Sequence, residues 1–149
     1  MIVRPHSLLL DAEALSALAR DDRSMQAWAT FAKRNDSVIY ASCLTLAEVT
    51  DGSARDAGVR RAVKAVRLVD VGPEIGFRAG QLRAAASASP RKQRDLTVDA
   101  VVAATALSLP TPVVVLTSDA EDLGLLLAGY DVRIEGICQG TLVSARRRS

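Results

Sequence analysis

The stretch VVVLTSDAEDLGLLLAG, residues 113–129, places three acidic side chains within four positions directly after an apolar run. The run at 113–116 is short and rich in Val, which predicts a buried strand. Asp119, Glu121 and Asp122 follow it at the start of a helix-forming segment. Like charges at close range repel. The acids therefore either cap a helix or surround a cation, and the rest of the chain has to distinguish the two.

Outward from this stretch, short apolar runs alternate with helix-forming segments along the chain. The alternation predicts a three-layer α/β/α sandwich around a mostly parallel central sheet. Ser42 and Thr97 are expected to cap the helices that follow them, and Asp21-Asp22 predicts a break in the first helix. The predicted strands cover residues 7–10, 37–41, 68–71, 113–116 and 132–134. The predicted helices cover residues 12–32, 42–51, 54–66, 74–88 and 97–109, with a further, acid-rich helix after the strand at 113–116.

The composition is that of an ordinary soluble protein, with 149 residues, 49% of them hydrophobic and 24% charged. We expect one domain over residues 1–143, followed by a basic, disordered tail at 144–149. Aromatic residues make up only 3% of the chain, which argues against a binding surface of stacked rings. Cys43 and Cys138 lie in unrelated contexts, and no apolar stretch is long enough to cross a bilayer. These features predict a reduced, cytoplasmic protein without a membrane contact.

Basic residues are clustered, although the formal net charge is only +2. Arg pairs bidentately with phosphate oxygens, so these clusters are candidates for binding nucleic acid. For each cluster, a solvated helix face is the alternative. The candidate RNA-binding residues are Arg55, Arg60 and Arg61 in the segment 54–66, and Arg91, Lys92 and Arg94 in a polar loop.

Acidic side chains from distant parts of the sequence are placed to share one edge of the predicted sheet. In an open parallel sheet, ligands bind beyond the carboxyl ends of the strands. Asp11 directly follows the first strand, and Asp119 lies just beyond the fourth, with Asp122 one helical turn further on. Glu48 lies on the helix after the second strand, and Asp99 lies in the first turn of a strongly apolar helix.

Each acid also has a purely structural interpretation. Asp11 fits the N-cap of the next helix, and residues 118–121 fit the S-x-x-E capping box, as residues 45–48 do if their helix starts late. The helix dipole favours Asp99. Caps do not explain, however, why Glu48 and Asp99 stand in apolar sequence, where a buried carboxylate needs a partner.

A hard divalent cation is the partner that the sequence favours. Few cationic side chains lie near these positions, and the single His6 precedes the first strand. Mg²⁺ or Mn²⁺ prefers oxygen ligands and keeps several waters. The lack of a Cys/His cluster disfavours zinc.

The segments that carry these acids resemble the PIN-domain ribonuclease family, in particular the VapC-type toxins of bacterial toxin–antitoxin pairs. The resemblance runs from Leu8 to about Ile134. Its most specific half is VDAVVAATAL…VVVLTSDAEDL, because helix, spacing, strand and acids all agree. The matching segments are LLLDAEALSAL with Asp11, SCLTLAEV with Glu48, TVDAVVAATAL with Asp99, and VVVLTSDAEDL with Asp119 and Asp122.

The resemblance implies a Mg²⁺- or Mn²⁺-dependent endoribonuclease that acts as the toxin of a toxin–antitoxin pair. It implies an RNA substrate, a homodimer, and a small VapB-like antitoxin that blocks the active-site groove. The implied catalytic residues, which would also hold one or two metal ions, are Asp11, Glu48, Asp99 and Asp119, with Asp122 as a further candidate ligand. Glu13 and Leu123 depart from the family pattern, which often has a small polar residue and Phe at these positions.

Three alternative functions remain open at the level of sequence. A phosphotransfer enzyme of the haloacid-dehalogenase or receiver type needs a lysine near a later strand, and the three lysines do not lie beside a predicted strand end. A DNA-directed, structure-specific nuclease could use the same acids. A non-catalytic nucleic-acid-binding PIN-like module would be indicated by a missing ligand, but every acid position is filled.

Overall fold

A computed structural model describes residues 4–86 and 95–137 of the chain. Over these residues, five strands form one sheet in the order β3-β2-β1-β4-β5, and every neighbouring pair is parallel. The strands are β1 (Ser7–Leu10), β2 (Val38–Ser42), β3 (Arg67–Val69), β4 (Val113–Thr117) and β5 (Arg133–Gly136). The predicted tail at 144–149 and the loop residues Arg91, Lys92 and Arg94 lie outside the described residues.

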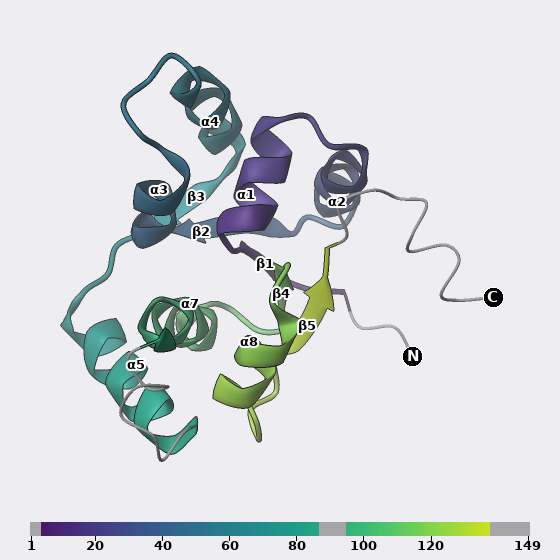
Figure 1. Cartoon of the computed structure of the whole chain (residues 1–149). Helices are drawn as coiled ribbons and strands as arrows, with labels where there is room; N and C mark the ends of the chain where they lie inside the picture. The colour runs from purple at the N-terminus through teal and green to yellow at the C-terminus, as the bar shows by residue number, and fades with distance from the viewer. Residues whose placement is uncertain (1–3, 87–94, 138–149) are drawn as a thin grey trace.

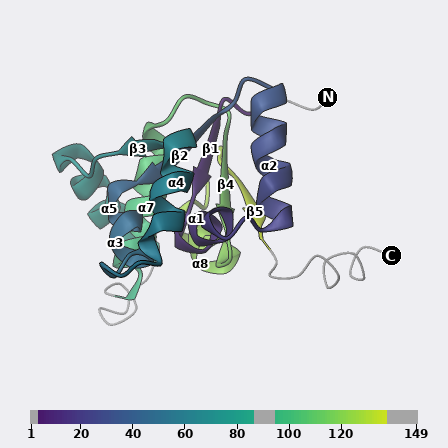
Figure 2. The ribbon, with the colours of Figure 1, turned by 90° about the horizontal axis from the view of Figure 1, so that it is seen from above.

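Helices cover both faces of the sheet, which confirms the predicted three-layer α/β/α sandwich. Above the strands in Figure 1 lie α1 (Ala12–Ala19), α2 (Arg23–Arg34) and α4 (Asp56–Ala62), and Figure 2 gives the view from above onto this layer. Below lie α5 (Pro73–Ala86), α7 (Thr97–Ser108) and α8 (Ala120–Leu126). The short helix α3 (Cys43–Val49) follows β2 directly, and the 3-10 helix η1 (Val63–Ala65) follows α4.

The central strands β1 and β4 are buried along their whole length. A strand that is covered on both faces needs apolar side chains at every position, which is why these segments read as continuous apolar runs. Successive side chains point to opposite faces. Leu8 and Leu10 therefore join the core beneath α1 and α2, whereas Leu9 joins the core with α5, α7 and α8.

The predicted break in the first helix is confirmed. Asp21 adopts a positive φ of 57°, and Asp22 caps α2 by accepting hydrogen bonds from the backbone N–H groups of Ser24 (2.9 Å) and Met25 (3.3 Å). The segment 54–66, predicted as one helix, is divided into α4 and η1. No helix among the described residues has both the length and the apolar character that crossing a bilayer requires.

The prediction that Thr97 caps α7 is wrong. Leu96 occupies the N-cap position, and no side chain caps this helix. The Thr97 hydroxyl instead accepts a hydrogen bond of 3.0 Å from the guanidinium group of Arg83. Because α5 packs beside α7, a long side chain on α5 reaches this hydroxyl from a neighbouring element, which a local capping pattern cannot reveal.

Candidate metal centre

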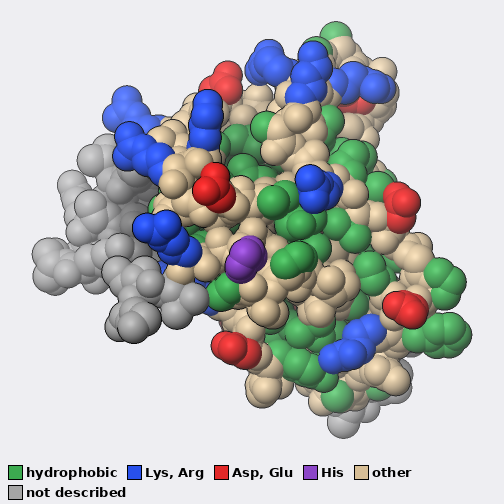
Figure 3. All heavy atoms as spheres, turned by 180° about the vertical axis from the view of Figure 1, so that it is seen from behind, with side chains coloured by type: hydrophobic (Ala, Val, Ile, Leu, Met, Phe, Trp, Pro, Cys, Tyr) green, Lys and Arg blue, Asp and Glu red, His purple; other side chains and the backbone are tan. Residues whose placement is uncertain are grey.

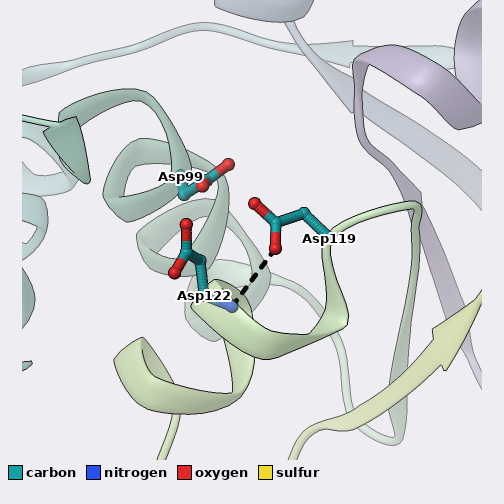
Figure 4. A group of neighbouring side chains, drawn as sticks. All are labelled: Asp99, Asp119 and Asp122. Carbon is teal, nitrogen blue, oxygen red and sulfur yellow. Dashed lines mark hydrogen bonds between the residues drawn. The ribbon is translucent and has the colours of Figure 1, made fainter.

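Three carboxylates lie together where α7 and α8 begin. Asp99 comes from the first turn of α7, and Asp119 and Asp122 come from the start of α8. One oxygen from each of the three lies within 4.8 Å of the others. Figure 4 shows that the carboxylates point toward one another across the gap between the two helices. The structure thus brings together acids from two segments that are distant in the sequence.

The start of α8 differs from the predicted capping box. Ser118 does not cap this helix. Asp119 occupies the N-cap position, and its carboxylate accepts a hydrogen bond of 3.4 Å from the backbone N–H of Asp122. The Asp119 N–H donates to the Thr117 hydroxyl at 2.8 Å, so the chain turns at Thr117 and the helix begins one residue later than predicted. A capping carboxylate uses one oxygen for this bond, which leaves its other oxygen available to a ligand.

Asp11 is held in place by three donors. As predicted, it caps the following helix, because its Oδ1 accepts a hydrogen bond of 2.9 Å from the Ala14 N–H. Its Oδ2 accepts from the Thr117 hydroxyl and, at 3.3 Å, from the Ser118 N–H. Thr117 thus joins Asp11 to the backbone of Asp119, and sequence reasoning gave it no role. The available signal was a polar residue that ends the apolar run of β4.

Glu48 lies on α3, at the exposed side of the site. The expectation that apolar neighbours bury it is wrong. Helix α3 packs through Leu44 against one core and through Leu46 and Val49 against the other, and these three side chains are partly buried while Glu48 is exposed. Partial burial and the charge of Asp11 nevertheless raise the pKa of the Glu48 carboxyl.

The electrostatics connect all five acids. Burial and the charges of Asp119, Asp122, Asp11 and Glu48 raise the pKa of Asp99 to about 6. Burial also raises the pKa of Asp11, although its hydrogen bonds oppose this effect. Each of the other four acids is thus close enough to Asp99 to disfavour its charged form. These couplings relate Asp11 and Glu48 to the close group, and their part in a metal site stays a prediction.

The donor set fits a hard divalent cation. All three carboxylates of the close group offer oxygen atoms, and no His or Cys joins them among the described residues. Oxygen ligands are those that Mg²⁺ and Mn²⁺ prefer. A cation bound there would also relieve the repulsion that raises the pKa of Asp99.

Two basic residues of the segment 54–66 have acidic partners. Arg55 pairs with Asp51 at 2.9 Å, and Arg61 pairs with Asp21 at 3.6 Å, both on the surface. Asp11 and Asp21 lie beyond opposite ends of α1. Because an eight-residue helix spans about 12 Å, the Arg61–Asp21 pair lies away from Asp11. A contact of Arg55, Arg60 and Arg61 with RNA stays a prediction.

A groove lies at the opposite end of the strands, where they begin, and the sequence analysis did not predict it. It has a volume of about 900 Å³ and lies between α2, η1 and the starts of β2 and β3. Ala32, Ile39 and Val66 contribute to an apolar floor, and the described residues that line it include no acid. Its cations are Lys33, Lys64 and Arg67. We call it the α2–β3 groove.

Comparison with known proteins gives one family and several related folds. The family model described as PIN domain matches residues 8–123. A search of curated proteins finds no match. Among solved structures, a chain of VapBC2 from Rickettsia felis bound to a promoter DNA fragment is similar, with a TM-score of 0.62 and 13% identity, over 87% of this chain and 98% of that one. A toxin–antitoxin complex from Klebsiella pneumoniae gives a TM-score of 0.59 and 20% identity, over 84% and 94% of the two chains. At such identities, the likeness establishes a shared fold.

Proposed function

The chain belongs to the PIN domain family, whose members are generally nucleases, and from this premise we propose that it is a divalent-metal-dependent endoribonuclease. The observation that carries the proposal is the close group of Asp99, Asp119 and Asp122, with oxygens within 4.8 Å of one another. Asp11 and Glu48 complete the set, because their charges act on Asp99 as well.

The five acids have different parts in this proposal. Asp99, Asp119 and Asp122 would hold the cation. Asp11, whose carboxylate is fixed by three hydrogen-bond donors, would add its negative charge beside them. A bound Mg²⁺ or Mn²⁺ would neutralise charge on the phosphodiester and would lower the pKa of water. Glu48, whose carboxyl has a raised pKa, would take up the proton of the attacking water.

A purified, full-length sample tests the activity directly. After treatment with a chelator and its removal, the protein should cleave a labelled single-stranded RNA when Mg²⁺ or Mn²⁺ is added, and chelation should stop the reaction. Asp99→Asn should abolish cleavage. Glu121→Gln is the matched control, because it removes an exposed charge from the first turn of α8 outside the close group, and it should cleave normally.

The same assay separates the alternatives. Equal cleavage of a DNA of the same sequence would favour a nuclease that does not select RNA. Binding of RNA without cleavage would favour a non-catalytic module. Cleavage that persists in excess chelator would contradict the proposed use of a metal.

We also propose that the protein is the cytoplasmic toxin of a toxin–antitoxin pair. Both solved structures named above come from toxin–antitoxin complexes. The α2–β3 groove supports a contact with an acidic, amphipathic segment of the antitoxin, because its apolar floor carries Lys33, Lys64 and Arg67 and no acid among the described residues. Figure 3 shows the face seen from behind, where basic side chains gather along the upper edge above exposed hydrophobic ones.

A homodimer is the remaining part of the proposal. Phe77 of α5 is 78% exposed, and a large apolar side chain in water is one that a second copy could cover. The dimer stays a prediction.

A further inference from the structure

Thr45 carries a buried hydroxyl group without a partner. Its side chain is fully buried, and its Oγ1 is the one buried side-chain oxygen or nitrogen without a hydrogen bond among the described residues. The other buried hydroxyl groups have partners, as Ser7 Oγ donates to Pro110 O at 2.7 Å and Ser42 Oγ accepts from Leu44 N at 3.1 Å. Burial of an unpaired hydroxyl is unfavourable, so this group needs an explanation.

Local structure explains why Thr45 has no backbone acceptor. A helical threonine can donate to the carbonyl oxygen four residues earlier, and Thr105 in α7 and Thr50 at the C-cap of α3 do so at 2.7 and 2.6 Å. The residue four before Thr45 is Ala41, which belongs to β2 and pairs there with β1 and β3. Thr45 therefore lacks the acceptor that the helix provides to other threonines.

The position of Thr45 on α3 places it beside a residue of the acidic site. Residues three apart on a helix are surface neighbours, so Thr45 lies next to Glu48. On the helical wheel, Thr45 stands between the exposed Glu48 and the partly buried Val49, and it is the one fully buried residue of α3. Strand β2, which α3 follows, pairs with β1, and β1 ends at Asp11.

We propose that Thr45 is a positioning residue for Glu48. When a divalent cation occupies the site, Glu48 turns inward and its carboxylate accepts a hydrogen bond from Thr45 Oγ1. An inward Glu48 adds its charge to those of the four other acids, and the cation offsets this repulsion. The inference rests on the metal site of the proposed function, and it gives the orphaned hydroxyl a partner in the loaded state only.

Binding of Mn²⁺ alone tests the inference, by calorimetry on the full-length, chelator-treated protein. Thr45→Val keeps the shape of the side chain and removes the donor, so Mn²⁺ affinity should fall about tenfold, the effect of one hydrogen bond to a charged group. Thr45→Ser restores the hydroxyl and should bind Mn²⁺ within about threefold of the parent chain, less than the loss of such a bond. The metal-free Thr45→Val protein should unfold at the same temperature or higher, because it loses only an unpaired group. If this variant does not fold, Thr45→Ala replaces it.

Coupling to Glu48 gives the decisive comparison. In a Glu48→Ala background, Thr45→Val should change Mn²⁺ affinity less than about twofold, because the acceptor is already gone. Unchanged affinity in Thr45→Val, or equal losses with and without Glu48, would overturn the inference. A parent chain that binds no Mn²⁺ would overturn it together with the metal site. A chain that shows the coupling but cleaves no RNA would overturn the nuclease proposal alone.

Discussion

Asp99 is the acid of the site whose charged form is disfavoured by burial and by all four other acids. It lies half-buried in the first turn of α7, where the helix dipole favours a charged carboxylate. Burial and four neighbouring acids outweigh the dipole, because they raise its pKa to about 6. Removing its charge should therefore stabilise the metal-free protein while it damages the site.

The effect on stability should depend on pH. The folded pKa of Asp99, about 6, is above its ordinary value of 3.8, so the folded protein binds the proton more tightly than the unfolded chain does. This contribution is fully present below pH 3.8 and is lost as the pH rises through 6. In chelator at pH 7.5, the free energy of unfolding of Asp99→Asn should exceed that of the parent chain by about 1 kcal/mol. This value is smaller than the pKa shift alone would give, because solvent screens a half-buried group.

Chemical denaturation at several pH values measures this difference. The gain should shrink between pH 7 and pH 5, where the Asp99 carboxyl of the parent chain becomes protonated. Asp131→Asn, at an exposed acid outside the close group, should show no comparable gain. A destabilised Asp99→Asn at pH 7.5 would instead assign a structural role to the carboxylate.

At the scale of elements, α1 and α4 pack closely where Gly58 meets the end of α1. A Cβ atom at Gly58 would lie 3.1 Å from the carbonyl oxygen of Ala19. That oxygen belongs to the backbone, which cannot rotate away as a long side chain could. The glycine inside α4 is therefore a consequence of helix packing.

Two glycine substitutions separate packing from helix propensity. Gly58→Ala gains up to about 1 kcal/mol of helix propensity, but the overpacked contact costs about 1–3 kcal/mol, so we expect a net loss near 1 kcal/mol. Gly124→Ala in α8 is the control, because no atom lies within 4 Å of its added Cβ, and it should stabilise the protein by about 0.5–1 kcal/mol. Thermal unfolding measures both. A stabilised Gly58→Ala protein would show that α1 moves away at little cost.

At the scale of the whole molecule, the acids and the α2–β3 groove lie at opposite ends of the strands of one sheet. All strands are parallel, the acids follow the ends of β1 and β4, and the groove lies at the starts of β2 and β3. A partner that docks in the groove would have to extend across the molecule to block the acids. Docking and inhibition can therefore be separated by substitution.

Reversal of charge in the groove should weaken the antitoxin complex. With Lys33→Glu and Lys64→Glu combined, the dissociation constant for the product of the adjacent gene should rise at least about tenfold, or 1.4 kcal/mol. RNA cleavage by the free protein should not change. Arg34→Glu, on α2 but outside the groove lining, is the control, and calorimetry measures all three. An unchanged dissociation constant in the double variant would exclude the groove as the docking site.

The sequence by itself determined the parallel sheet and the helices on both of its faces, and it predicted the five acids as the candidate site. Apolar runs and helical periodicity are local signals, and the shared direction of parallel strands brings their carboxyl ends to one edge. That is why Asp11 and Asp119 could be predicted to lie together from the sequence.

Only the tertiary structure decided which atoms meet. Asp119 caps α8 in place of Ser118 because Thr117, itself bonded to Asp11, accepts its N–H. Glu48 lies exposed because Leu44, Leu46 and Val49 of α3 take the packed positions. The α2–β3 groove exists because α2, η1 and two strand starts leave a space between them. Each of these three features depends on contacts between elements that are distant in the chain. Such contacts produce no periodic pattern in the sequence, so the sequence does not predict them.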